Sequence, residues 1–167
     1  MSKLLRYYSA GNAYFVTAVT YRREAILLEH VDLFWRALQS VRRNANFEPI
    51  AWVVLPDHFH MIINPGGENL SSLMQRIKMS FATNYRKRRG IYRGHVWQNR
   101  FWDHIVRNEN DMNRHIDYIH YNPVKHGFVV SPFDWEQSSI RDYHRRDLYE
   151  LDWGQAESLV FEGDFGE

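Results

Sequence analysis

The stretch IAWVVLPDHFHMII, residues 50–63, decides the fold of this chain. Two apolar runs lie on either side of a Pro-Asp pair, which favours a turn, so we expect a strand over 50–55, a turn at 56–57 and a second strand over 58–63. Side chains of a strand alternate between its faces, so His58 and His60 share one face. Ile62 lies on the same face as the histidines, and Phe59, Met61 and Ile63 share the other face. One face can therefore pack in a core while the other presents two imidazoles.

The histidine pair is a candidate metal site. Neutral imidazoles are common ligands of divalent ions, and two at this spacing leave coordination positions open for a substrate oxygen and water. A pair at positions i and i+2 is also compatible with two histidines that merely satisfy hydrogen bonds. The rest of the chain has to distinguish these interpretations.

The segments around the hairpin alternate between strand and helix patterns. YFVTAVTY (14–21) is rich in β-branched and aromatic residues, which favour strands, and the apolar spacing over 30–45 predicts an amphipathic helix. A second helix begins after Asn69, a suitable N-cap, and runs to about 88, and a fourth strand covers 96–106. The order β-α-β-β-α-β predicts an α+β fold with a ferredoxin-like (RRM-like) antiparallel sheet.

A final helix follows from about Asp111, and we expect it to stop near Asn122 because Pro123 disfavours helical geometry in the residue before it. At 100° per residue, one apolar stripe faces the sheet, and Tyr118 and Asn122 lie one turn apart on its shoulder, whereas Tyr121 points away from the core. The Asn122 amide oxygen could complete a coordination sphere begun by the imidazoles. The alternatives are an ordinary buried ring for Tyr118 and a C-capping role for Asn122.

Length and composition set bounds on the class of protein. The 167 residues, 44% of them hydrophobic, suit one compact domain. The sequence contains no cysteine, which excludes disulfides, cysteine nucleophiles and thiolate zinc sites. The N-terminus lacks an apolar stretch of signal-peptide length, and no apolar run approaches the roughly 20 residues of a membrane helix. We therefore expect a soluble cytoplasmic protein with no membrane partner.

Charge is distributed unevenly along the chain. Residues 76–107 carry nine Lys or Arg against one acid, whereas residues 147–167 carry seven acids and no Lys or Arg. Aromatic residues lie among the cations, and this mixture is typical of surfaces that bind single-stranded nucleic acid, although some of the rings must pack in the core. The predicted nucleic-acid-binding residues are Lys78, Arg86, Lys87, Arg88, Arg89, Arg93 and Arg100. A solvated helix end is the alternative for the run 86–89.

Two motifs resemble a known family. PDHFH (56–60) after an apolar strand resembles the HUH motif of single-tyrosine nucleases, and the segment VWQNRFWDHIVRNENDMNRHIDYIHYNPVKHGFV (96–129), with WEQSSIRDY after it, is similar to the REP-associated tyrosine transposases. These are relatives of insertion-sequence transposases that act on hairpin-forming single-stranded DNA. The resemblance covers about residues 14–143.

The resemblance implies roles for four residues. His58, His60 and Asn122 correspond to the ligands of a Mg²⁺ or Mn²⁺ ion, although other branches of the superfamily have glutamine at the position of Asn122. Tyr118 corresponds to the nucleophile, which forms a 5′-phosphotyrosine intermediate. No small-molecule cofactor is implied.

The resemblance also implies a domain organisation and a setting. We expect one transposase domain over 1–146, with the tyrosine helix after the sheet, and an acidic C-terminal tail over 147–167. Hairpin DNA is the expected partner, the bacterial cytoplasm with its nucleoid the expected location, and a monomer is favoured over a dimer.

Three hypotheses remain open from the sequence. The first is the DNA-cleaving and joining enzyme, which needs Tyr118 and the metal. The second is an RRM-like nucleic-acid-binding protein without catalysis. The third is a metal-dependent hydrolase that uses bound water, with Tyr118 as a hydrogen-bond donor.

Overall fold

A four-stranded antiparallel sheet forms the centre of the protein in the computed structural model, which describes residues 13–156 and 158–167. The strands are β1 (Tyr14–Val19), β2 (Glu48–Val54), β3 (His58–Asn64) and β4 (Trp102–Ile105), paired in the order β2-β3-β1-β4. The predicted α+β fold with an antiparallel sheet is confirmed. The first twelve residues of the predicted domain lie outside the described residues.

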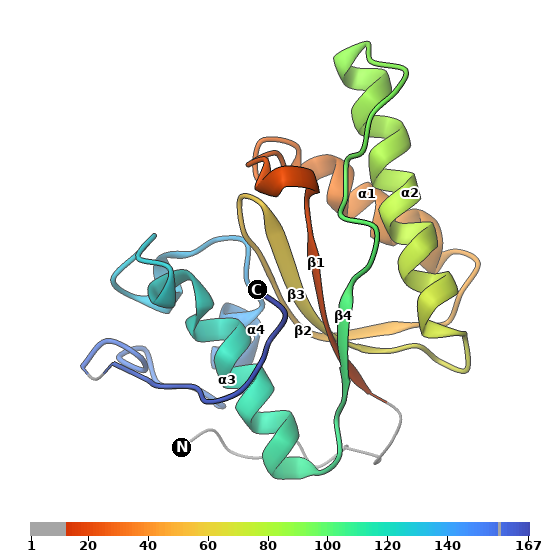
Figure 1. The fold of residues 1–167 in the computed structure, drawn as a ribbon. Coiled ribbons are helices and arrows are strands. Elements are labelled where there is room, and N and C mark those ends of the chain that lie inside the picture. Colours follow the sequence, from red (N-terminus) through yellow and green to blue (C-terminus); the bar gives the residue numbers. More distant parts are fainter. Residues whose placement is uncertain (1–12, 157) are drawn as a thin grey trace.

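Helices cover both faces of the sheet (Figure 1). The helices α1 (Val31–Arg42) and α2 (Leu70–Arg89) lie on one face, and α3 (Glu109–Lys125) lies on the other. The alternation predicted for β3 is observed, because Phe59 and Met61 are buried with α1 and α2 while Ile62 is buried with α3. The face of β3 that carries the two histidines is therefore the face covered by α3.

The second helix begins and ends as the sequence indicates. Asn69 caps α2, since its side chain accepts a hydrogen bond from the backbone N–H of Ser72 at 3.0 Å. Gly90 ends the helix in the left-handed conformation at φ +66°, which is unfavourable for residues with a side chain. This helix holds the cationic run 86–89 in its last turn.

The fourth strand is shorter than predicted. Residues 96–101 form no regular strand, apart from an isolated bridge between Trp97 and Thr20. Trp97 is buried, and its indole N–H donates to the backbone oxygen of Lys78 in α2 at 3.0 Å. This bond holds the segment against α2, and only from Trp102 does the chain pair regularly with β1. Trp97 is one of the aromatic residues that the sequence places among the cations. Its burial shows that it packs in the core.

The expectation that α3 ends near Asn122 is wrong. The helix passes through Pro123 and ends at Lys125, with His126 as its C-cap. Pro123 removes only its own N–H, the donor to the oxygen of Ile119, and the helix continues past it, because the N–H of His126 donates to the oxygen of Asn122 at 3.0 Å. Asn122 is thus a helical residue and not the predicted C-cap, and the added turn brings Lys125 and His126 near it.

Two short elements, the 3-10 helix η2 (Pro132–Asp134) and the helix α4 (Ile140–His144), extend the layer formed by α3. A further 3-10 helix, η1 (Tyr21–Arg23), follows β1. The acidic tail packs along α3: Tyr121, which points away from the sheet, is buried against Trp153 and Phe161. No helix in the described ranges has the length and apolar character needed to span a membrane.

Candidate active site

Two imidazoles on β3 are oriented by neighbouring hydrogen-bond acceptors. The Nδ1 atom of His58 lies 2.6 Å from the Asp57 carboxylate, which can only accept, so this nitrogen carries a proton. The Thr17 hydroxyl donates to the Phe165 carbonyl at 2.6 Å, so it accepts from Nδ1 of His60 at 2.7 Å. Both Nε2 atoms therefore face the space beneath α3.

The protonation states follow from burial and these contacts. Burial lowers the pKa of His60 to about 4, so its ring is neutral at physiological pH. Burial acts in the same direction on His58, but the hydrogen bond to Asp57 and the negative charge of the nearby Glu167 carboxylate outweigh it and raise the pKa of His58. The partner carboxyl responds in turn, since its bond with His58 lowers the pKa of Asp57 to about 2.

The donor set fits a divalent ion. In the part of the chain that the structure describes, two buried side-chain polar atoms have no hydrogen-bond partner: Nε2 of His58 and Oδ1 of Asn122. Leaving such atoms unpaired is costly, and both are ordinary metal ligands. A carboxylate oxygen of Glu167 lies within 4.8 Å of a ring nitrogen of His58 and of His60, so the tail places a negative charge next to the two imidazoles.

Tyr118 reaches this site from α3. It is fully buried, and its ring packs edge-on against His60 with a centroid distance of 5.3 Å. Its hydroxyl accepts a hydrogen bond from Nζ of Lys125 at 3.2 Å. Burial and the nearby Glu167 carboxylate raise the pKa of Tyr118 well above its usual value. The predicted residues Tyr118, Asn122 and the histidine pair are thus brought together within one chain.

The end of the acidic tail lies inside the same site. Phe165 stacks on Tyr118 with a centroid distance of 3.7 Å and an interplanar angle of 9°. The Glu167 carboxylate lies 2.7 Å from Nδ2 of Asn122 and 2.9 Å from Nε2 of His60. Its other contacts are with Lys125, in an ion pair, and with Nε2 of His126 at 3.2 Å. A carboxylate therefore sits among the candidate metal ligands and the tyrosine.

The charge of Glu167 is well compensated in this position. Burial would raise the pKa of its carboxyl, but bonds with His126, the histidine pair and Lys125 lower this pKa far below its usual value. A site that holds one anion so firmly can hold another of similar size, such as a phosphate.

A second group of possible ligands, formed by His104, Asp111 and His115, has a different arrangement. The rings of His104 and His115 are nearly parallel, at 18° and 4.7 Å, so their in-plane lone pairs do not converge on one point. The Asp111 carboxylate already accepts hydrogen bonds from the backbone and side chain of Arg107. This cluster joins β4 to the first turn of α3.

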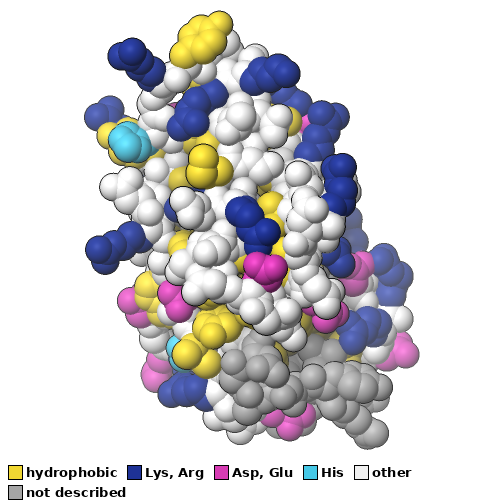
Figure 2. All heavy atoms as spheres, turned by 90° about the vertical axis from the view of Figure 1, so that its right-hand side faces the viewer, with side chains coloured by type: hydrophobic (Ala, Val, Ile, Leu, Met, Phe, Trp, Pro, Cys, Tyr) yellow, Lys and Arg dark blue, Asp and Glu magenta, His cyan; other side chains and the backbone are white. Residues whose placement is uncertain are grey.

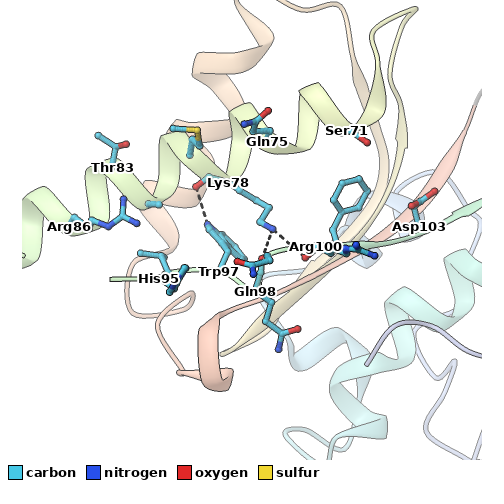
Figure 3. Close-up of a pocket in the computed structure, with 15 residues that line it drawn as sticks. Ser71, Gln75, Lys78, Thr83, Arg86, His95, Trp97, Gln98, Arg100 and Asp103 are labelled. Carbon is cyan, nitrogen blue, oxygen red and sulfur yellow. Dashed lines mark hydrogen bonds between the residues drawn. The ribbon is translucent and has the colours of Figure 1, made fainter. Parts of the chain in front are cut away.

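A basic groove runs between α2 and residues 95–103. Figure 2 shows the corresponding side of the molecule, where Lys and Arg side chains crowd the upper half and acidic ones lie mainly lower. The groove has a volume of about 600 Å³, and Lys78, Arg86 and Arg100 line it together with Gln75 and Gln98 (Figure 3). The Lys78 ammonium crosses the groove to the backbone oxygens of Gln98 and Arg100, at 2.8 and 3.3 Å.

Comparisons with known proteins agree with this arrangement. The family described as "Transposase IS200 like" matches residues 7–122. The chain belongs to this transposase family. It is 38% identical to the REP-associated tyrosine transposase of Escherichia coli K12, over 92% of this chain and 91% of that protein. It is 33% identical to a Haemophilus influenzae protein assigned to the same group, over 98% of this chain and 99% of that protein.

A solved structure matches the whole transposase chain. It is the structure of a REP-associated tyrosine transposase bound to a REP hairpin, with 38% sequence identity and a TM-score of 0.81. The match covers 100% of this chain and 98% of the other. The family resemblance predicted from the sequence is therefore confirmed.

The predicted DNA-binding cations of the transposase differ in their surroundings. Arg88 is engaged in two hydrogen bonds with the Asp32 carboxylate of α1, at 2.8 and 2.6 Å. Arg86 donates to the backbone oxygen of Gly94 at 2.7 Å. Lys87, Arg89, Arg93 and Arg100 are exposed on the surface.

Several residues of the transposase site were not predicted. Thr17, Lys125, His126, Phe165 and Glu167 all contact the predicted residues. Thr17 could have been found from pairing, because it lies directly opposite His60 in the register of β1 with β3. Lys125 and His126 were missed because the helix was expected to end before them.

Proposed function

We propose that this protein is a transposase that cuts and rejoins hairpin-forming, REP-like single-stranded DNA through a 5′-phosphotyrosine at Tyr118. The observation that carries this proposal is the packing of the Tyr118 ring against His60 at 5.3 Å, within a single chain. The relative whose solved structure covers the chain is itself bound to a REP hairpin, which supports hairpin DNA as the substrate.

His58, His60 and Asn122 are the proposed ligands of Mg²⁺ or Mn²⁺. The unpaired atoms of His58 and Asn122 support this assignment. When bound, such an ion withdraws charge from the scissile phosphate and orients it for in-line attack. Asp57 and Thr17 keep the ligand nitrogens free by accepting the protons of the opposite ring nitrogens.

The chain's own residues provide the nucleophile. Oη of Tyr118 forms a bond to phosphorus as the bond from phosphorus to the 3′ oxygen breaks, which leaves a 5′-phosphotyrosine and a free 3′ hydroxyl. A different 3′ hydroxyl can reverse the step and join the strands, since the covalent intermediate conserves the phosphodiester. Before DNA enters, Glu167 and Phe165 must leave the site, because they occupy the space next to Tyr118.

The basic groove is the proposed binding surface for the hairpin and its flanking strand. Lys78, Arg86 and Arg100 line it, and Lys87, Arg89 and Arg93 lie on the exposed surface beside it. Cations bind phosphates without regard to sequence, so this surface supplies affinity. Because one chain contains all the site residues, we infer a monomer, which would act on the bacterial nucleoid.

A covalent-adduct assay tests the proposal. The protein is incubated with a labelled hairpin oligonucleotide and Mg²⁺ or Mn²⁺, denatured, and examined for label that migrates with the protein. We expect an adduct that Tyr118→Phe abolishes. Tyr121→Phe is the matched control, because this tyrosine lies on the same helix but on the side away from the histidines, and it should retain the adduct.

The other outcomes would overturn the proposal in distinguishable ways. Binding without cleavage would indicate a nucleic-acid-binding protein without catalysis. Cleavage that survives Tyr118→Phe would indicate a hydrolase that uses bound water.

A further inference from the structure

Lys125 contacts the oxygen that the proposed function makes the nucleophile. Its Nζ donates to the Tyr118 hydroxyl at 3.2 Å and lies 5.2 Å from the centroid of the tyrosine ring. The lysine is the last residue of α3, two turns beyond the tyrosine on the same helix. Its side chain is 40% exposed, so a substrate can approach it from the solvent side.

The same ammonium also contacts the anion that occupies the site. Lys125 pairs with the Glu167 carboxylate, whose oxygens lie against His60 and Asn122. A carboxylate and a phosphate share negative charge and oxygen acceptors, so Glu167 marks a position that suits a phosphate. One cation therefore lies between the attacking oxygen and the anion-binding position.

We propose that Lys125 is a catalytic residue that stabilises negative charge on the Tyr118 oxygen during cleavage and rejoining. This inference rests on the proposed function. A tyrosine is a poor nucleophile while it holds its proton, with an ordinary pKa of about 10, and its phenolate is the group that must leave when the strands are rejoined. A hydrogen bond from an ammonium stabilises the phenolate in both directions.

The proton and bond changes balance without another reactant. In cleavage, the phenolic proton passes to water, the Oη–phosphorus bond forms, the bond to the 3′ oxygen breaks, and that oxygen takes a proton from water. Rejoining reverses each change. Lys125 keeps its proton throughout and acts only as a hydrogen-bond donor.

Lys125 could instead have a purely structural role, which would be to hold the tail in the site. A variant of Glu167 distinguishes this role from the catalytic one. Lys125→Met and Glu167→Gln both remove the same ion pair. If Lys125 only holds the tail, the two variants should form adduct at similar rates. If Lys125 acts on Tyr118, only Lys125→Met should be slow.

The experiment measures single-turnover adduct formation by the full chain with a labelled hairpin oligonucleotide and Mn²⁺. We expect Lys125→Met to slow adduct formation about 100-fold, the usual effect of removing a donor to a developing anion, with hairpin affinity no weaker than that of the wild type. Glu167→Gln should be no slower than the wild type. Arg145→Met, which removes a cation on the surface just beyond α4, is the matched charge control. Added ethylamine should raise the rate of adduct formation by Lys125→Ala in proportion to the ethylamine concentration. Lys125→Arg should form adduct faster than Lys125→Met.

Two results would overturn the role of Lys125. The first is a Lys125→Met rate equal to that of the wild type or of Glu167→Gln. The second is a slow variant that also has weaker DNA binding or a lower melting temperature and is not restored by ethylamine, which would indicate a structural role. Absence of any adduct with the wild-type chain would instead refute the proposed function itself.

Discussion

Removal of residues 165–167 should accelerate adduct formation. These residues fill the space next to Tyr118, so the tail and the DNA compete for one site. The competition is intramolecular. The apparent affinity for DNA is therefore reduced by a factor close to the ratio of chains with the tail in the site to chains with the tail released. The faster rate should therefore be seen at DNA concentrations below saturation.

The size of the effect follows from the contacts of the tail. Burial of the Phe165 ring, which is 7% exposed, stabilises the bound tail by about 2 kcal/mol. Four hydrogen bonds hold the tail, one from Thr17 to the Phe165 carbonyl and three from Asn122, Lys125 and His126 to Glu167, and together they add about 4 kcal/mol, at the low end of the range because Lys125 is partly exposed. Ordering three residues costs about 4 kcal/mol. The net of about 2 kcal/mol corresponds to a roughly 30-fold faster reaction without the tail.

The assay compares the initial rate of adduct formation by the full chain and by a chain that lacks residues 165–167. Glu167→Gln should give a smaller increase, since the aromatic stack on Tyr118 remains. Val160→Ala is the matched control, because this side chain of the same tail is 86% exposed. Equal rates for the full and shortened chains across all DNA concentrations would refute the reasoning.

Three further outcomes are expected. Asp57→Asn should weaken Mn²⁺ binding by about 10- to 100-fold in calorimetry, because the imidazole that it orients can then adopt the wrong tautomer; unchanged affinity would contradict this. Arg89→Met should reduce the slope of log affinity against log salt concentration by about 0.8 in hairpin binding. Arg88→Met should reduce this slope less, because the Asp32 carboxylate of α1 already pairs with Arg88. Equal slopes for the two variants would argue against this distinction. His120 is fully buried, which lowers its pKa to about 3, so the unfolded chain takes up a proton near pH 6.5 that the folded chain does not. The free energy of unfolding should therefore fall by about 1.4 kcal/mol per pH unit from His120 below about pH 6, and His60, whose pKa is lowered to about 4, adds a similar decline. His120→Gln should decline less steeply than the wild type in urea titrations, by about 1.4 kcal/mol per unit, and equal slopes in the two proteins would exclude His120 as a source.

Local periodicity explains which parts of the site could be predicted. The period of two in β3 placed both imidazoles on one face, and the helical period placed Tyr118 and Asn122 on one stripe of α3. Packing α3 on that face of the sheet then brings the stripes together. Both periods depend only on residues within a single element, so the sequence of that element is enough to predict which side chains share a face.

Contacts between distant segments explain what could not be predicted. Glu167 is 107 residues from His60, and no local pattern indicates that the tail ends in the site. Pro123 was expected to end α3 because proline disfavours helical geometry in the preceding residue, but this is a preference that Asn122 overrides within the packed helix. The segment 96–101 is rich in residues typical of strands, but the bond from Trp97 to α2 keeps it from pairing along β1.

The register between β1 and β3 has a consequence for how this chain can change. Thr17 lies opposite His60, and Val19 lies opposite His58. Insertion or deletion of one residue early in β3 would reverse the side of the sheet on which each following side chain emerges. Because β3 begins at His58, His58 would keep its side while His60 would be turned into the hydrocarbon layer beneath α1 and α2, and the pair would no longer face one site. This strand therefore tolerates substitutions more readily than changes in length.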